Sequence, residues 1–234
     1  PHVFGENGKP FHNSVIATFS YQLARGEKIT LLVDKKLELV HAQKLADRFY
    51  EIALKSIVGE IVISGFPMKV SRLMEKLKSY NKNYRNHLIP SFQNDLDLDL
   101  FNTYRSYFPS SYYPVKFEEH SDDRGSLYEV SKTMNGSQCF VSSTKPGMTR
   151  GNHYHKEKIE RFVVLKGKAK ISIRRKFLNE VVEYFVNGET PSYIDIPTLC
   201  THNIENIGDT EMIVLFWAHQ LFDVNNPDTY YEEV

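Results

Sequence analysis

Two histidines separated by one residue, His153 and His155, lie at the centre of the stretch that could do chemistry. Side chains alternate along a strand, so on a strand both imidazoles point to the same face. Glu160 follows five residues later, and from the next strand of a hairpin its carboxylate can close back onto the same point. Neutral imidazoles and a carboxylate suit a divalent first-row ion. The spacing predicts a metal site.

A second stretch, residues 197–206, supplies a fourth candidate ligand, His202. The two cysteines, Cys139 and Cys200, are too few and too far apart for a zinc ribbon or a disulfide framework. Cys200 lies two residues before His202, and we interpret it as a small buried thiol rather than as a ligand.

Both stretches resemble the motifs of the cupin family. The spacing Gly-x5-His-x-His-x4-Glu-x6-Gly, from Gly147 to Gly167, fits the first cupin motif at every position. Residues 197–206 resemble the second motif, Pro-x-Gly-x-x-His-x3-Asn, except that Leu199 replaces its glycine and Gly188 lies farther upstream than expected. The resemblance implies an all-β jelly roll that binds zinc through four ligands: His153, His155, Glu160 and His202.

Composition and charge exclude several classes of partner. The 234 residues suffice for one large domain or two ordinary domains. Lys+Arg and Asp+Glu balance at 29 each, so no basic field invites nucleic acid. No apolar run approaches the ~20 residues that cross a bilayer, and we expect no signal peptide. We expect a soluble, cytoplasmic protein with neither nucleic acid nor membrane as partner.

Residues 1–108 alternate helical and extended patterns, which is typical of an α/β domain. Asp95, Asp97 and Asp99 are interpreted as solvated acids at a helix N-terminus rather than as metal ligands. Helices are expected at 13–26, 40–55, 70–77 and after Asp95, and strands at 28–33 and 57–63.

The turn-rich residues 109–114 mark a domain boundary, so we expect domains at 1–108, which includes a helical connector, and 109–234. The second domain has short strands separated by turns, as in a β-sandwich or jelly roll. They are expected at 139–143, 162–165, 170–174, 181–186, 193–196 and 212–217.

Residues 1–5 and 13–19 resemble the C-terminal, substrate-facing part of extended short-chain dehydrogenase/reductases that act on nucleotide sugars. The resemblance implies a partial reductase domain with Asn13 at the substrate. The chain has no Gly-rich strand–turn–helix fingerprint and begins without Met. We therefore expect an N-terminally truncated protein without an NADPH site. Two Tyr-x3-Lys matches, Tyr128…Lys132 and Tyr154…Lys158, lie in strand-like sequence and are interpreted as coincidences.

Three further stretches sharpen the resemblance. Residues 122–129 and 150–154 resemble signatures of deoxysugar-nucleotide 3,5-epimerases, and residues 216–230 are similar to the end of bifunctional capsular-polysaccharide enzymes that fuse a reductase to a zinc cupin. The resemblance implies a homodimer whose cupin epimerises C3 of a UDP-linked 4-keto-6-deoxy-N-acetylhexosamine. In the full-length protein the reductase then reduces C4 with NADPH, for N-acetyl-L-fucosamine synthesis in capsular or O-antigen polysaccharide.

The residues are consistent with this chemistry, because a C4 ketone acidifies the C3–H for removal by a base. Arg124 and Arg150 could stabilise the enolate or hold the diphosphate. In the metal-free epimerases the histidine matching His153 is the base, whereas in metal-binding cupins it is a ligand. The complete ligand set favours the ligand role. The base is then open among three candidates: Lys158, Tyr154 and His120.

Two other functions stay open. One is a non-catalytic zinc cupin that binds a sugar nucleotide, since four protein ligands leave a tetrahedral zinc no open position. The other is a metal-dependent cupin dioxygenase, since three histidines and a glutamate also bind iron, manganese or nickel in such enzymes. Metal identity and oxygen consumption separate the dioxygenase from the epimerase, and deuterium exchange at C3 separates the epimerase from the binding protein.

Overall fold

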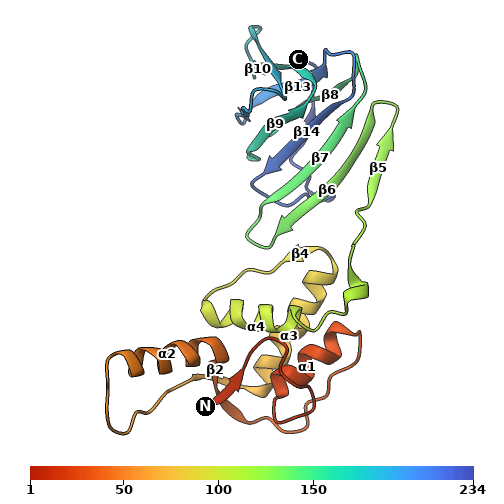
Figure 1. Ribbon diagram of the computed structural model, residues 1–234. Coiled ribbons are helices and arrows are strands. Elements are labelled where there is room, and N and C mark those ends of the chain that lie inside the picture. Colours follow the sequence, from red (N-terminus) through yellow and green to blue (C-terminus); the bar gives the residue numbers. More distant parts are fainter. The chain divides into compact units, whose positions relative to one another are not determined.

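The computed structural model describes residues 1–234, which form two compact units that follow one another along the chain (Figure 1). The first unit comprises residues 1–86 and 90–115, and the second comprises residues 87–89 and 116–234. The division differs from the expected boundary at 108/109 in two places. Tyr112 stacks on Tyr84 of the first unit, whereas residues 88–89 pair with a strand of the second. None of the helices combines the length and apolar character needed to cross a membrane.

The first unit packs helices on a small mixed sheet. Strand β1 (His2–Phe4) runs parallel to β2 (Lys36–His41), and β3 (Phe66–Lys69) runs antiparallel to β2. The helices are α1 (Val15–Ala24), α2 (Ala42–Leu54), α3 (Val70–Arg85), α4 (Asp95–Arg105) and the 3-10 turn η1 (Ser110–Tyr112). Side-chain caps start two of them: Ser14 accepts from the Ala17 amide and Asn94 from the Asp97 amide. The expected helices are present, and α3 runs eight residues beyond its expected end at 77.

The prediction of the two strands in this unit is wrong. Residues 28–33 and 57–63 are not strands, and the strands lie further along the chain, at 36–41 and 66–69. Ile29 is buried in the core, but Leu32 and Val33 are exposed. A short apolar run shows only that some of its residues are buried, because strand formation also needs a partner.

The acids of α4 are not all solvated, contrary to expectation. Asp97 is 2% exposed, and its carboxylate accepts from Lys76 Nζ at 2.7 Å and from the Gln93 amide at 3.0 Å. Asp95 and Asp99 both pair with Lys44. Burial of Asp97 is possible because Lys76 supplies the opposite charge.

The second unit is almost entirely β and contains two sheets (Figure 1). One sheet has the order β11-β10-β13-β8-β15, and the other has the order β12-β9-β14-β7-β6-β4, with β5 added on β6. Buried side chains of both sheets, among them Ile171 and Ile204 from the first and Phe162 and Val214 from the second, share one core. The unit is a sandwich consistent with the expected cupin jelly roll. The strands are β4 (Leu88–Ile89), β5 (Glu119–Asp122), β6 (Gly125–Thr133), β7 (Gln138–Thr144), β8 (Thr149–Tyr154), β9 (Glu160–Lys166), β10 (Lys168–Arg175), β11 (Val181–Asn187), β12 (Ile194–Ile196), β13 (Cys200–Asn206), β14 (Met212–Ala218) and β15 (Tyr230–Tyr231).

The six strands expected after residue 115 are present, but the expected hairpin between His155 and Glu160 is wrong. Strand β8 pairs with β13 and β15, whereas β9 pairs with β14 and β12 in the other sheet. Residues 155–159 therefore form a crossover loop that passes from one sheet to the other. This crossover, rather than a hairpin turn, brings the carboxylate towards the imidazoles.

Candidate metal centre and cavity

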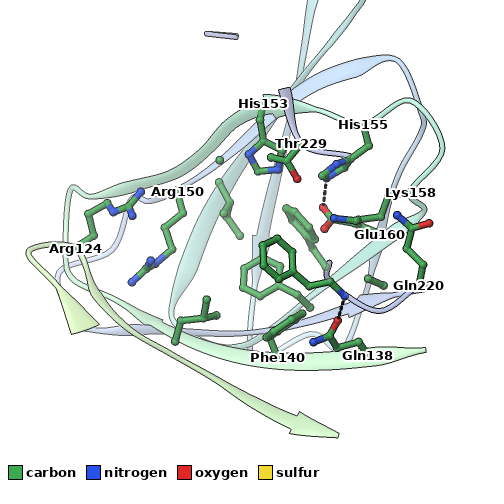
Figure 2. A pocket seen from close by; sticks show the side chains of 17 residues that line it. Arg124, Gln138, Phe140, Arg150, His153, His155, Lys158, Glu160, Gln220 and Thr229 are labelled. Carbon is green, nitrogen blue, oxygen red and sulfur yellow. Dashed lines mark hydrogen bonds and ion pairs between the residues drawn. The ribbon is translucent and has the colours of Figure 1, made fainter. Parts of the chain in front are cut away.

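The four candidate ligands converge between the two sheets. Their ligand atoms all lie within 4.8 Å of one another. His153 ends the inward-facing side of β8, and His202 is its register partner on β13. His155 follows β8 directly, and Glu160 is the first residue of β9. Figure 2 shows His153, His155 and Glu160 directed towards the same region.

The rings of His155 and His202 are oriented by backbone carbonyls. His155 Nδ1 donates to the Asp228 carbonyl, and His202 Nδ1 donates to the Cys200 carbonyl at 3.1 Å. Each bond leaves the Nε2 lone pair facing the cluster. Both Nε2 atoms are buried and make no hydrogen bond, although Glu160 Oε2 lies 3.1 Å from the first and 3.4 Å from the second. Two buried, unsatisfied nitrogens beside a carboxylate fit a bound cation.

The protonation states also suit a metal. Burial alone would raise the pKa of Glu160, but the neighbouring His155 and His202 rings outweigh it and hold that pKa below its ordinary value. Burial, followed by the neighbouring rings of His202 and His155, lowers the pKa of His153 to about 4. At neutral pH the centre offers a carboxylate and a neutral imidazole, which are the forms that bind metal.

A cavity of about 350 Å³ opens beside this centre and has the size of a small-molecule site. His153, His155 and Glu160 contribute to its wall, and Arg124 and Arg150 approach from another side (Figure 2). Much of the remaining wall is apolar: Leu127, Phe140, Phe162, Ile204, Phe216, Ala218 and Phe222. The cavity therefore has two arginines on one side and the candidate metal ligands on another, with an apolar floor between them.

The two arginines share one carboxylate. Arg124 is half-exposed and binds Asp122 through Nε at 3.0 Å and Nη2 at 2.5 Å. Hydrogen bonds from Arg124 and the charge of Arg150 lower the pKa of Asp122 to about 2. Arg150 is largely buried, and it donates to Thr144 Oγ1 at 3.1 Å and to the Ser143 carbonyl at 3.2 Å. Arg150 is thereby held rigidly at the cavity wall.

The three candidate bases lie in different places. Lys158 is buried and lines the cavity, and its Nζ donates to the Pro227 carbonyl at 2.9 Å. Tyr154 does not line it, because on β8 it faces away from His153 and stacks on Tyr230. His120 lines a neighbouring cavity of about 490 Å³.

Asn13, the remaining candidate, belongs to the first unit. It lines a surface cavity there with Val15 and Thr18, and its φ of 53° places it in the left-handed region.

Sequence reasoning missed several residues of the cavity. Gln138 is buried, and its Oε1 accepts from the Phe222 amide at 2.6 Å while its Nε2 donates to Glu129. Gln220 and Thr229 also line the wall. Gln220, Phe222 and Thr229 come from the tail after β14. The resemblance of residues 216–230 to the end of a known enzyme family was the one sequence feature that pointed to this tail.

Leu199, the departure from the second cupin motif, has a φ of 58°. This left-handed conformation favours glycine, which explains why the motif has glycine there. The Leu199 amide donates to the His155 carbonyl at 2.7 Å, so the strained residue supports the loop that carries a candidate ligand.

Comparisons with known proteins agree with this architecture. The family described as "Polysaccharide biosynthesis C-terminal domain" matches residues 120–230. The crystal structure of the capsular polysaccharide assembling protein CapF from Staphylococcus aureus matches the whole chain with 36% identity and a TM-score of 0.90. A second CapF structure, with the inhibitor 3-isopropenyl-tropolone, gives the same identity and TM-score, and this chain covers 69% of it. The chain belongs to the CapF family.

Two curated relatives extend the comparison. The UDP-2-acetamido-2,6-beta-L-arabino-hexul-4-ose reductase of Pseudomonas aeruginosa is 31% identical over 98% of this chain. The probable low-salt glycan biosynthesis epimerase Agl13 of Haloferax volcanii is 30% identical over 47% of this chain and 78% of its own length. The chain spans 63% of the P. aeruginosa relative and 65% of the first CapF chain.

Proposed function

We propose that the second unit is a sugar-nucleotide epimerase of capsular or O-antigen polysaccharide synthesis, which inverts C3 of a UDP-linked 4-keto-6-deoxy-N-acetylhexosamine. The observation that carries the proposal is that one cavity joins the His/Glu centre, the buried amine of Lys158 and the guanidinium groups of Arg124 and Arg150. The relatives support it, because one is a probable glycan-biosynthesis epimerase and another a reductase of a UDP-linked hexul-4-ose.

The proposed reaction is a proton exchange at C3. The C4 ketone acidifies the C3–H. We assign Lys158 Nζ as the base that removes this proton because, of the three candidate bases, it alone lines the cavity. A second group, which exchanges its proton with solvent water, then returns a proton to the opposite face of the planar enolate and so inverts C3. Positive charge and hydrogen-bond donors fixed beside the enolate oxygen lower the barrier.

Arg150 and Arg124 are assigned to the diphosphate of the substrate. Guanidinium groups bind phosphate oxygens in pairs, and rigid placement reduces the entropy lost on binding. Arg150 meets this condition through its contacts with Thr144 and Ser143. The apolar floor then lies under the sugar ring, where it excludes water.

We propose zinc as the ion, since three imidazoles and one carboxylate form a ligand set that zinc commonly takes. His153, His155, Glu160 and His202 would hold it. When bound, it would supply positive charge beside the developing enolate. A purely structural zinc is the alternative, and it predicts that C3 exchange survives in a folded, metal-free variant.

We propose that the second reaction, reduction of the C4 ketone, is carried out by a longer protein that includes this chain. Reduction of C4 would use NADPH, and we propose that the whole protein is a homodimer and that Asn13 of the first unit contacts substrate during that reaction. The isolated chain is expected not to oxidise NADPH with the 4-keto substrate, and oxidation would overturn this assignment.

Incubation of the chain with the UDP-4-keto sugar in deuterium oxide tests the epimerase directly. Deuterium at C3 supports it. A folded, metal-loaded chain that leaves C3 protonated would instead favour the non-catalytic binding protein, and consumption of oxygen with bound iron, manganese or nickel would favour the dioxygenase.

A further inference from the structure

The crossover loop of residues 155–159 is held by the C-terminal tail rather than by strand pairing. Three consecutive loop amides converge on one carboxylate: Lys156 N donates to Asp228 Oδ1 at 3.0 Å, and the amides of Glu157 and Lys158 donate to Oδ2 at 2.9 and 2.8 Å. A carboxylate that accepts three backbone amides fixes the path of the loop.

The backbone next to that carboxylate contacts the functional side chains of the same loop. The Asp228 carbonyl accepts from His155 Nδ1, and the Pro227 carbonyl accepts from Lys158 Nζ. One dipeptide therefore orients both a candidate metal ligand and the candidate base. Asp228 itself has a φ of 43°, a left-handed conformation that aspartate tolerates better than most residues.

The tail is anchored directly after this dipeptide. Tyr230 and Tyr231 pair with Tyr154 and His153 as strand β15. Beyond them, Glu232 accepts from Arg174 at 2.7 Å and from Thr201 Oγ1 at 3.1 Å. Asp228 is thus attached to a fixed strand, so its position can determine that of the loop.

We propose that Asp228 is the positioning residue of the metal centre. Its carboxylate fixes residues 156–158 and its carbonyl fixes the Nδ1–H tautomer of His155, so that His155 Nε2 faces Glu160 and Lys158 faces the cavity. The inference rests on the proposed metal site, and it assigns metal affinity partly to a residue that does not touch the ion. Partners of this kind typically change metal affinity by 10–100-fold.

The test measures the zinc affinity of the full chain by competition with a chelator, for the parent, Asp228→Asn, Asp228→Gly and Asp223→Ala. Asparagine and glycine both accept the left-handed backbone, so they remove the carboxylate without new strain. Asp223 is the matched control, because it lies in the same tail and its carboxylate accepts from the Asn225 amide instead of the loop.

We expect zinc affinity to fall about 10-fold or more in both Asp228 variants and to change less than about twofold in Asp223→Ala. If Asp228 had only a structural role, its substitution would lower the melting temperature of the metal-free protein and leave zinc affinity unchanged. The inference is overturned if either Asp228 variant is shown by circular dichroism to be folded and still binds zinc as tightly as the parent. A parent that binds no zinc overturns the proposed metal centre and this inference together.

Hydrogen exchange on the metal-free parent adds a test that needs no variant. The amides of Lys156, Glu157 and Lys158 should exchange slowly, because all three are bonded to Asp228. Exchange of these amides at the rate of an open loop contradicts the proposed role.

Discussion

His155 Nε2 lies 3.1 Å from Glu160 Oε2, and these two residues stand at the two ends of the loop that connects the two sheets of the second unit. His155 follows β8 in the five-stranded sheet, and Glu160 opens β9 in the other. An ion bound by both, and by His202 on β13, would connect the two sheets across the core. Metal binding would therefore stabilise the sandwich.

Removal of the metal should destabilise the second unit. A ligand present at 100 times its Kd stabilises a folded protein by about 2.7 kcal/mol. Calorimetry with zinc and with a chelator should show a lower melting temperature for this unit after chelation, by about 2–8 °C per kcal/mol. His202→Ala should melt at the same temperature under both conditions. Equal melting of the parent in zinc and in chelator would contradict this stabilisation.

Lys158→Met should slow proton exchange at C3 and leave the metal in place. General acid–base groups typically contribute about 10²–10⁴-fold, so deuterium incorporation at C3 should slow by a factor in this range. Lys156→Met is the matched control, because Lys156 is an exposed lysine of the same loop whose amine lies 4.2 Å from the Tyr230 ring centre. Zinc content, measured on all samples, should stay at the parent level. Wild-type exchange in Lys158→Met would remove Lys158 as the base.

Arg150→Lys should weaken binding of the nucleotide sugar although it keeps the positive charge. Lysine cannot donate simultaneously to Thr144, Ser143 and a phosphate, because it lacks the guanidinium fork. Loss of one charge-assisted hydrogen bond, worth about 1.5–3 kcal/mol, predicts at least about 10-fold weaker binding by calorimetric titration. Arg161→Lys removes a fork that binds Asp195, away from the cavity wall, and should bind as the parent does. Unchanged binding in Arg150→Lys would exclude this arginine from the phosphate site.

Leu199→Gly should be more stable than Leu199→Ala. Alanine keeps the Cβ that disfavours a φ of 58°, at a cost of about 1–2 kcal/mol. Glycine removes that cost but loses about 0.5–1 kcal/mol of unfolded-state entropy. By chemical denaturation, the free energy of unfolding of the glycine variant should therefore exceed that of the alanine variant by up to about 1.5 kcal/mol. An alanine variant that equals or exceeds it would show that the left-handed backbone carries no strain.

The sequence was sufficient to predict which residues meet at the centre, because alternation on a strand and motif spacing bring His153, His155, Glu160 and His202 to one place. It did not reveal that a crossover loop between two sheets brings Glu160 towards the histidines. Sheet membership depends on which distant strands pair, here β8 with β13 and β9 with β14. Local spacing is the same for a hairpin and a crossover.

Burial of charge and the role of the tail could not be predicted for the same reason. Asp97 is buried because Lys76 reaches it from another helix, and that contact leaves no local pattern. Asp228 lies 73 residues after His155 in the chain, in a tail whose family likeness gave no residue a role. The helices of the first unit were easier to predict, because caps and apolar periodicity are signals within a short stretch of sequence.

Deuterium exchange at C3 of a UDP-4-keto-6-deoxy-N-acetylhexosamine, followed by proton NMR in deuterium oxide, tests the central claim most directly. The parent chain and His202→Ala are compared, with folding and metal content measured on both. We predict loss of the C3 proton signal in the metal-loaded parent at a rate proportional to protein concentration. A folded, metal-loaded parent that leaves this signal unchanged would contradict the epimerase.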